Sequence, residues 1–78
     1  MEYERLYTEY ESAIRNQKSV INTYLKKRSS ANRKANYKEV CRINGILYTL
    51  YSEKNELEQS AAQLKDYITN TDRIQNRS

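Results

Sequence analysis

Apolar residues recur at heptad spacing along two long stretches of this chain, and the two patterns are complementary. In a heptad lettered a to g, positions a and d form the buried seam of a coiled coil. The first stretch fills these positions with Tyr3, Tyr7, Tyr10, Ile14, Gln17, Ile21, Tyr24 and Arg28. The second stretch fills them with Val40, Ile43, Leu47, Leu50, Lys54, Leu57, Ala61, Leu64 and Ile68. When the chain folds back on itself, each a position faces a d position, and their residue numbers sum to 71. The sequence therefore predicts an antiparallel two-helix coiled-coil hairpin.

The main alternative is a register slipped by one heptad, with pairs of residue numbers that sum to 64. That register leaves Leu64 and Ile68 at the end of the second stretch without partners. The sum of 71 instead places the two polar seam residues, Gln17 and Lys54, in one layer, where we expect the Gln17 side chain to accept a hydrogen bond from the Lys54 ammonium. A polar layer lowers stability but specifies register. We therefore favour the sum of 71.

The 78 residues are enough for one domain, which we expect to be all-α. There is no proline and only one glycine, Gly45, so little in the chain interrupts a helix. We expect a first helix over about 2–33, a turn over about 33–36, a second helix over about 37–70 and a frayed polar tail over 71–78. Asn36 followed three residues later by Glu39 is typical of a capping box at the start of the second helix.

Further apolar residues lie beside the seam, at positions g and e. They are Leu6, Ala13, Val20, Ile46, Tyr51 and Tyr67. In an isolated hairpin these side chains stay largely exposed, and exposed apolar surface of this extent is typical of an interaction site. We expect two hairpins to associate through them into a homodimeric four-helix bundle. The alternative is a groove that binds a helix of a different protein.

Basic residues gather around the expected turn. They are Lys26, Lys27, Arg28, Arg33, Lys34, Lys38 and Arg42. Residues 26–42 carry a net charge of +6, whereas the whole chain carries +4. Such a concentrated charge attracts the phosphates of nucleic acid or of an anionic membrane, and Tyr37 could stack on a base. The alternative is a solvated turn, in which the basic residues that end the first helix complement its dipole.

The sequence offers little to enzyme chemistry. It contains no histidine and no glycine-rich phosphate loop, and Cys41 is its only cysteine, so we expect no internal disulfide, metal site, cofactor or catalytic activity. No stretch approaches the roughly 18 apolar residues of a membrane span, and we expect a cytoplasmic protein. The predicted function is a small protein–protein interaction module, acting as an adaptor, regulator or inhibitor. The alternative is binding of nucleic acid or a phosphate backbone through the basic tip.

Overall fold

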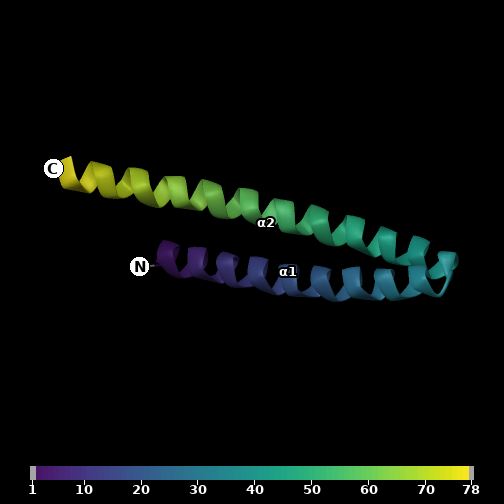
Figure 1. Ribbon diagram of the computed structural model, residues 1–78. Helices are drawn as coiled ribbons and strands as arrows, with labels where there is room; N and C mark the ends of the chain where they lie inside the picture. The colour runs from purple at the N-terminus through teal and green to yellow at the C-terminus, as the bar shows by residue number, and fades with distance from the viewer. Residues whose placement is uncertain (1, 78) are drawn as a thin grey trace.

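The chain forms two long helices that pack side by side in opposite directions, as predicted (Figure 1). The computed structural model describes residues 2–77, and the side chains of residues 2–70. Helix α1 spans Glu2–Arg33 and helix α2 spans Tyr37–Arg77. Together they make a rod of 65 × 14 × 14 Å. The turn lies at one end of the rod, and the outer ends of both helices lie at the other, where α2 extends beyond α1 (Figure 1).

The turn is closed by two backbone hydrogen bonds. The amide of Ala35 donates to the carbonyl of Asn32 at 3.0 Å, and the amide of Asn36 donates to the carbonyl of Ala31 at 2.9 Å. This pair of bonds is a Schellman motif, a common ending of an α-helix, and it requires a left-handed backbone at one position. That position is Ala35, with φ of 56°. A left-handed backbone costs a residue that has a Cβ about 1–2 kcal/mol. The alanine at position 35 therefore opposes the turn, which forms in spite of that cost.

Asn36 ends the turn and begins α2. Its side-chain oxygen accepts a hydrogen bond from the amide of Glu39 at 3.4 Å, which is one half of a capping box. The other half is not formed. The amide of Asn36 is already bonded within the turn, and the Glu39 carboxylate instead binds the Arg42 guanidinium, with 3.0 Å from Nε to Oε2. The predicted box is therefore only half correct, because the turn satisfies the donor that Glu39 would have bound.

The packing between the helices fits the register in which residue numbers sum to 71. Ile21, Ile43 and Leu47 form the central core cluster, and Tyr24, Leu25 and Leu50 pack against it. Near the open end of the rod, the rings of Tyr3 and Tyr67 meet edge to face with centroids 5.0 Å apart. In the slipped register Tyr3 would face Ala61, about 9 Å along α2 from Tyr67. The ring contact therefore excludes the slip.

The polar residues of the seam do not pair as predicted. The Gln17 amide nitrogen donates to the carbonyl of Leu50 at 3.2 Å and to the Glu53 carboxylate at 2.9 Å. The Lys54 ammonium instead binds Glu58, one turn further along its own helix, at 2.9 Å. Both groups thus find partners on α2, and the predicted bond between Gln17 and Lys54 is wrong. Gln17 still ties the two helices together, because it reaches from α1 to the backbone of α2.

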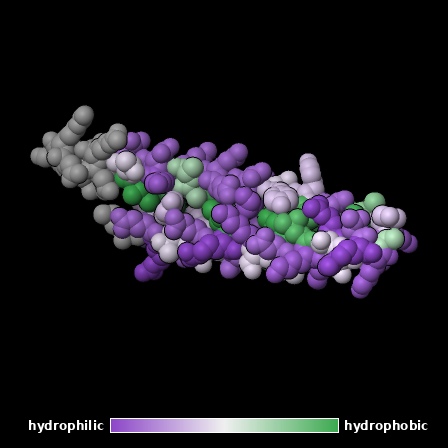
Figure 2. Space-filling view, viewed as in Figure 1, coloured by the Kyte–Doolittle hydropathy of each residue, from purple (hydrophilic) through white to green (hydrophobic). Residues whose placement is uncertain are grey.

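The core is thin and unevenly distributed along the rod. Among the residues whose side chains are described, the buried apolar ones are Ile21, Ala31, Ile43, Leu47 and Ala61. On the face shown in Figure 2, hydrophobic residues form separate patches along the rod, surrounded by hydrophilic ones. Each helix has a single partner, so most of its surface faces water.

Helix α2 continues beyond the end near residue 70 that the sequence suggested. Residues 71–77 contain neither proline nor glycine, so nothing in them stops a helix. The side chains of residues 71–78 lie outside those described, and fraying of the polar tail stays a prediction.

Candidate interaction surfaces

The hairpin presents two flanks, one on each side of its seam. In an antiparallel pair of helices, g positions lie beside g positions and e positions beside e positions. The g flank consists of Leu6, Ala13, Val20 and Lys27 on α1, Lys34 in the turn, and Glu39, Ile46, Glu53, Ser60 and Tyr67 on α2. The e flank consists of Glu4, Glu11, Lys18, Leu25 and Asn32 on α1 and Tyr37, Asn44, Tyr51, Glu58 and Lys65 on α2.

Charge interactions across the seam support this assignment of the two flanks. The Arg42 guanidinium, and to a smaller extent the Lys27 ammonium of α1, hold the pKa of the Glu39 carboxyl below its usual value. On the other side, Lys54, and to a smaller extent Lys18 of α1, lower the pKa of Glu58. Lys27 therefore lies near Glu39 on the g flank, and Lys18 lies near Glu58 on the e flank.

The six predicted interaction residues do not form one surface. Five of them lie on the g flank, namely Leu6, Ala13, Val20, Ile46 and Tyr67. Leu6 and Val20 are each 41% exposed and Tyr67 is 52% exposed, whereas Ala13 and Ile46 are half-buried. Tyr51, 42% exposed, lies on the e flank and belongs to a different surface. The g flank is thus the more apolar of the two.

Sequence reasoning missed Tyr48, the most exposed large apolar residue among those whose side chains are described. Tyr48, at position b next to the e flank, is 77% exposed, and its neighbour on that flank, Tyr51, is also exposed. The heptad letter of Tyr48 was the available signal, because position b points away from the seam. Gly45 lies on the same helix, and a Cβ added there would meet no atom within 4 Å. The packing within the hairpin therefore does not require a glycine at this position.

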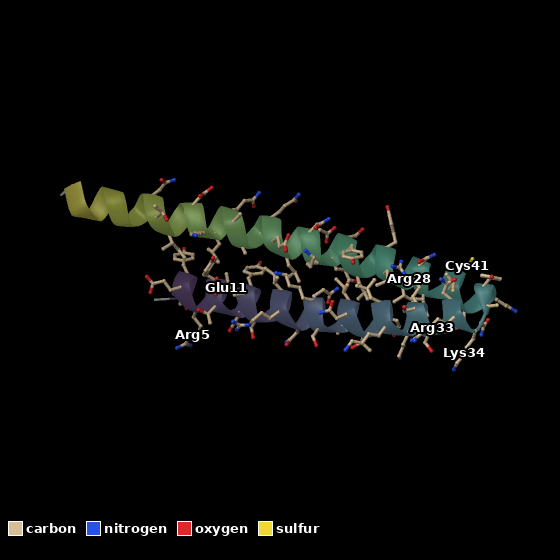
Figure 3. All side chains as sticks on the ribbon, in the orientation of Figure 1. Arg5, Glu11, Arg28, Arg33, Lys34 and Cys41 are labelled. Atoms are coloured by element: carbon tan, nitrogen blue, oxygen red, sulfur yellow. The ribbon has the colours of Figure 1, made fainter. Side chains whose placement is uncertain are left out.

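The seven basic residues of the tip fall into two groups. Three make contacts within the hairpin. The Arg28 guanidinium donates to the Asn44 side chain at 3.0 Å, Arg42 binds Glu39, and the Lys27 ammonium lies 5.0 Å from the ring centroid of Tyr24. The other four, Lys26, Arg33, Lys34 and Lys38, are exposed, and their side chains have no hydrogen bond or ion pair with the described residues. Figure 3 shows Arg28, Arg33 and Lys34 near the turn, while Arg5 and Glu11 lie toward the other end.

A shallow groove of about 440 Å³ lies on the e flank in the open half of the rod. Tyr7 and Ile14 of α1 and Ala61 and Ala62 of α2 supply its apolar lining. Its charged lining mixes both signs, with Glu11, Arg15, Lys18, Glu58 and Lys65. The groove is open to solvent and offers no enclosed space in which a small ligand could be desolvated.

No protein-family model, curated protein or solved structure matches this chain. Neither helix has, within the described residues, an apolar stretch long enough to cross a membrane. The same residues contain no cluster of three or more side chains suited to hold a metal ion. The candidate surfaces are therefore the g flank, the e flank and the basic tip.

Proposed function

We propose that this chain is a non-enzymatic protein–protein interaction module that binds a helical partner through its g flank. The observation that carries the proposal is the exposure of Leu6, Val20 and Tyr67 on one side of a hairpin with very few buried residues. Burying apolar surface stabilises an association by roughly 25 cal/mol per Å² before the costs of association are counted. A helix packed over this flank would gain that contribution and would also shield the seam from water.

The first partner that we propose is a second copy of the chain, giving a four-helix bundle. Two-fold homodimers are the commonest protein assemblies, and a g flank facing its own copy buries the same residues twice. A hairpin of this size gains only about 3–5 kcal/mol from one core. Association would add to that core without any new sequence element. An adaptor or regulator would then display its remaining surfaces, the e flank and the basic tip, on the outside of the bundle.

Sedimentation equilibrium on the purified chain tests this proposal. We expect about twice the chain mass of 9.3 kDa at micromolar concentration. Val20→Asp should give a monomer that keeps its helical circular dichroism, because it places a charge on the g flank without disturbing the seam. The matched control is Ser19→Asp, which places the same charge at exposed position f and should leave the dimer intact.

A dimer that is unchanged in Val20→Asp would place the interface elsewhere. A monomeric parent chain would overturn the homodimer and leave a helix of a different protein as the partner. In that case affinity capture with the parent chain and with Val20→Asp, compared by mass spectrometry, would look for proteins that bind only the parent chain.

The second candidate function is binding of nucleic acid by the basic tip. It is favoured by the four exposed basic residues whose side chains have no partner in the described part of the chain, and by Tyr37, which is 65% exposed and lies among them in the sequence. Electrostatic binding of this kind weakens steeply with salt, and an exposed aromatic ring can stack on a base.

Fluorescence anisotropy with labelled single-stranded and double-stranded DNA and RNA tests this candidate. Binding at low salt should be lost in the triple variant that combines Lys26→Ser, Arg33→Ser and Lys38→Ser. The control variant Arg5→Ser, Arg15→Ser, Lys65→Ser removes the same charge away from the tip and should retain binding. An absence of binding to every probe at low salt removes this candidate, as does an equal loss in both variants.

A further inference from the structure

The charges on the g flank are segregated along the rod. At position g and the neighbouring position c, the exposed basic residues are Lys27, Lys34 and Arg42, and all lie near the tip. Among the described residues, the exposed acidic ones there that have no ion pair are Glu2, Glu9, Glu53 and Glu56, and all lie toward the open end. Glu39 is the one acid of this flank near the tip, and it is paired with Arg42. Each end of the g flank therefore carries the charge that the other end lacks.

An uncharged segment separates the two ends. Residues 19–25 of α1 and 43–52 of α2 contain no charged side chain. They include Val20 and Ile46 of the g flank, together with the central core cluster of Ile21, Ile43 and Leu47. This segment is the part of the flank that a second molecule could cover without desolvating a charge.

We infer that the partner on the g flank is a second copy packed antiparallel, with its tip beside the open end of the first. This inference rests on the proposed function and adds the orientation of the two molecules. The two-fold axis crosses the middle of the uncharged segment, between the levels of Val20 and Ile46 along the rod. Lys27 of each copy then lies level with Glu53 and Glu56 of the other, and Lys34 lies level with Glu9.

Charge selects this orientation because burial of apolar surface is not directional. The apolar residues of the flank gain from being covered whichever way the second rod points. A parallel pair would bring Lys27 level with Lys27 and Glu53 level with Glu53 across the interface, and like charges at an interface act against that arrangement. The antiparallel pair replaces each of these repulsions with an attraction.

The e flank has no such segregation and gives no comparable preference. Its charged residues and those at the neighbouring position b are Glu4, Glu11, Arg15, Lys18, Glu58 and Lys65. They all lie in the same half of the rod and their charges cancel. The pattern is therefore specific to the flank that also carries the exposed Leu6 and Val20.

Pulsed electron spin resonance measures the orientation directly. A nitroxide is attached at Arg5→Cys in a Cys41→Ser background, so that each chain carries one label near its open end. Both positions are exposed, and unchanged circular dichroism would show that the fold is retained. In the antiparallel dimer the labels should be on the order of 50 Å apart, at about 1.5 Å per residue from the two-fold axis. In a parallel dimer they should lie within about 30 Å, because neighbouring helices pack roughly 10 Å apart.

The salt dependence of the dimer gives an independent test. Salt screens attraction and repulsion alike, so the dissociation constant of the antiparallel dimer should rise at least about threefold between 50 and 500 mM NaCl. That of a parallel dimer should fall. The double variant Lys27→Glu, Lys34→Glu should have a dissociation constant that falls with salt, because its tip then repels the acidic end of its partner. The control is the double variant Lys26→Glu, Arg33→Glu, which changes the charge of the tip at positions away from the g flank. Its dissociation constant should rise with salt as that of the parent chain does.

The outcomes distinguish failure of the antiparallel orientation from failure of the proposed homodimer. A short label distance with a dissociation constant that falls with salt overturns the antiparallel orientation and leaves the proposed dimer in place. Absence of a dimer at any accessible concentration overturns the proposed homodimer, and the orientation with it. A long label distance with a rising dissociation constant supports both.

Discussion

The two halves of the hairpin use the same heptad pattern but bury very different amounts of it. Of the five buried apolar residues among those whose side chains are described, the tip half, residues 19–52, holds four and the open half holds Ala61. In the tip half Ile21 packs with Ile43 and Leu47, which fill the seam with aliphatic side chains. In the open half α1 supplies Tyr3, Tyr7 and Tyr10, and Tyr3 and its ring partner Tyr67 are each about half exposed.

The difference shows that heptad spacing determines where the helices meet, while residue type determines how completely the seam is buried. A tyrosine places its ring against the partner helix and keeps its hydroxyl at the wet edge, so it contributes contact without full burial. We therefore expect the tip half to hold most of the stability of the hairpin and the open half to open first.

The largest effect should come from a charge in the tip-half core. Ile43 is 1% exposed, so Ile43→Asp buries a carboxylate without a partner. We expect a loss of more than about 3 kcal/mol, which is comparable to the whole stability of a hairpin with so thin a core. Helical circular dichroism should collapse. Tyr48→Asp, at a 77% exposed position on the same helix, should retain it. Helicity that survives Ile43→Asp would place the core elsewhere.

A smaller effect should come from the open half. Tyr3→Ala removes an edge-to-face ring contact and should lower the free energy of unfolding by about 1 kcal/mol in chemical denaturation. Tyr3→Phe retains the ring and should lose much less. Hydrogen exchange should accelerate in the first turns of α1 while amides around Ile43 keep their protection. Equal acceleration in both halves would show that the hairpin opens as one unit and would remove the contrast between them.

The turn at the tip should respond in the opposite direction. Ala35 has a φ of 56°, which glycine adopts freely. Ala35→Gly should therefore raise the free energy of unfolding by about 0.5–1 kcal/mol after the greater freedom of glycine in the unfolded chain is counted. Ala62→Gly, the same substitution in the middle of α2, should lower it by about 1 kcal/mol. If both variants lose stability, the left-handed turn is not the conformation in solution.

The smallest effect should be a dependence on alkaline pH that originates in the open half. A hydrogen bond with Tyr67 raises the pKa of Tyr3 above 10.0, and a hydrogen bond to Glu11 raises that of Tyr7. Folding thus favours the neutral phenols. Their contribution is complete below pH 10.0 and is lost as the pH rises through the higher pKa values of the folded state.

Thermal melting at pH 9 and pH 11 should measure this loss. The double variant Tyr3→Phe, Tyr7→Phe should show a smaller drop in melting temperature than the parent chain. The same replacement of Tyr37 and Tyr48, which are exposed residues of the tip half, should leave the drop unchanged. Equal drops in the parent chain and in the Tyr3, Tyr7 variant would remove this contribution.

The helices and their register were predictable because they depend on many residues acting together. Each of the two seams repeats over several heptads, so one misplaced residue does not change the answer. Ile21 and Leu50, whose numbers sum to 71, both contribute to the observed core, Ile21 within the central core cluster and Leu50 packed against it. Details that depend on one side chain were not predictable. Gln17 could reach Lys54, but the carbonyl of Leu50 and the Glu53 carboxylate lie within its range and bind it instead.

The residues of the candidate interaction surface were predictable, but their separation onto two opposite flanks was not. The sequence places Tyr51 beside the seam, as it does Val20, and only the antiparallel arrangement separates position e from position g onto opposite sides. The contacts of the basic tip were likewise hidden, because the partner of Arg28 is Asn44 on the other helix. Which basic residues stay available to a ligand depends on such contacts across the turn.

The outer ends of both helices lie at the same end of the rod, and this determines how the molecule responds to force (Figure 1). A pull applied between these two ends acts across the seam and breaks one layer at a time, starting from the tyrosines. Separating the helices in this way needs little force at each step, because only one layer bears the force at a time. Sliding the helices past each other would instead apply the force to every layer at once. A protein attached through both ends would therefore unzip gradually toward the turn and reclose from the turn when the tension is released.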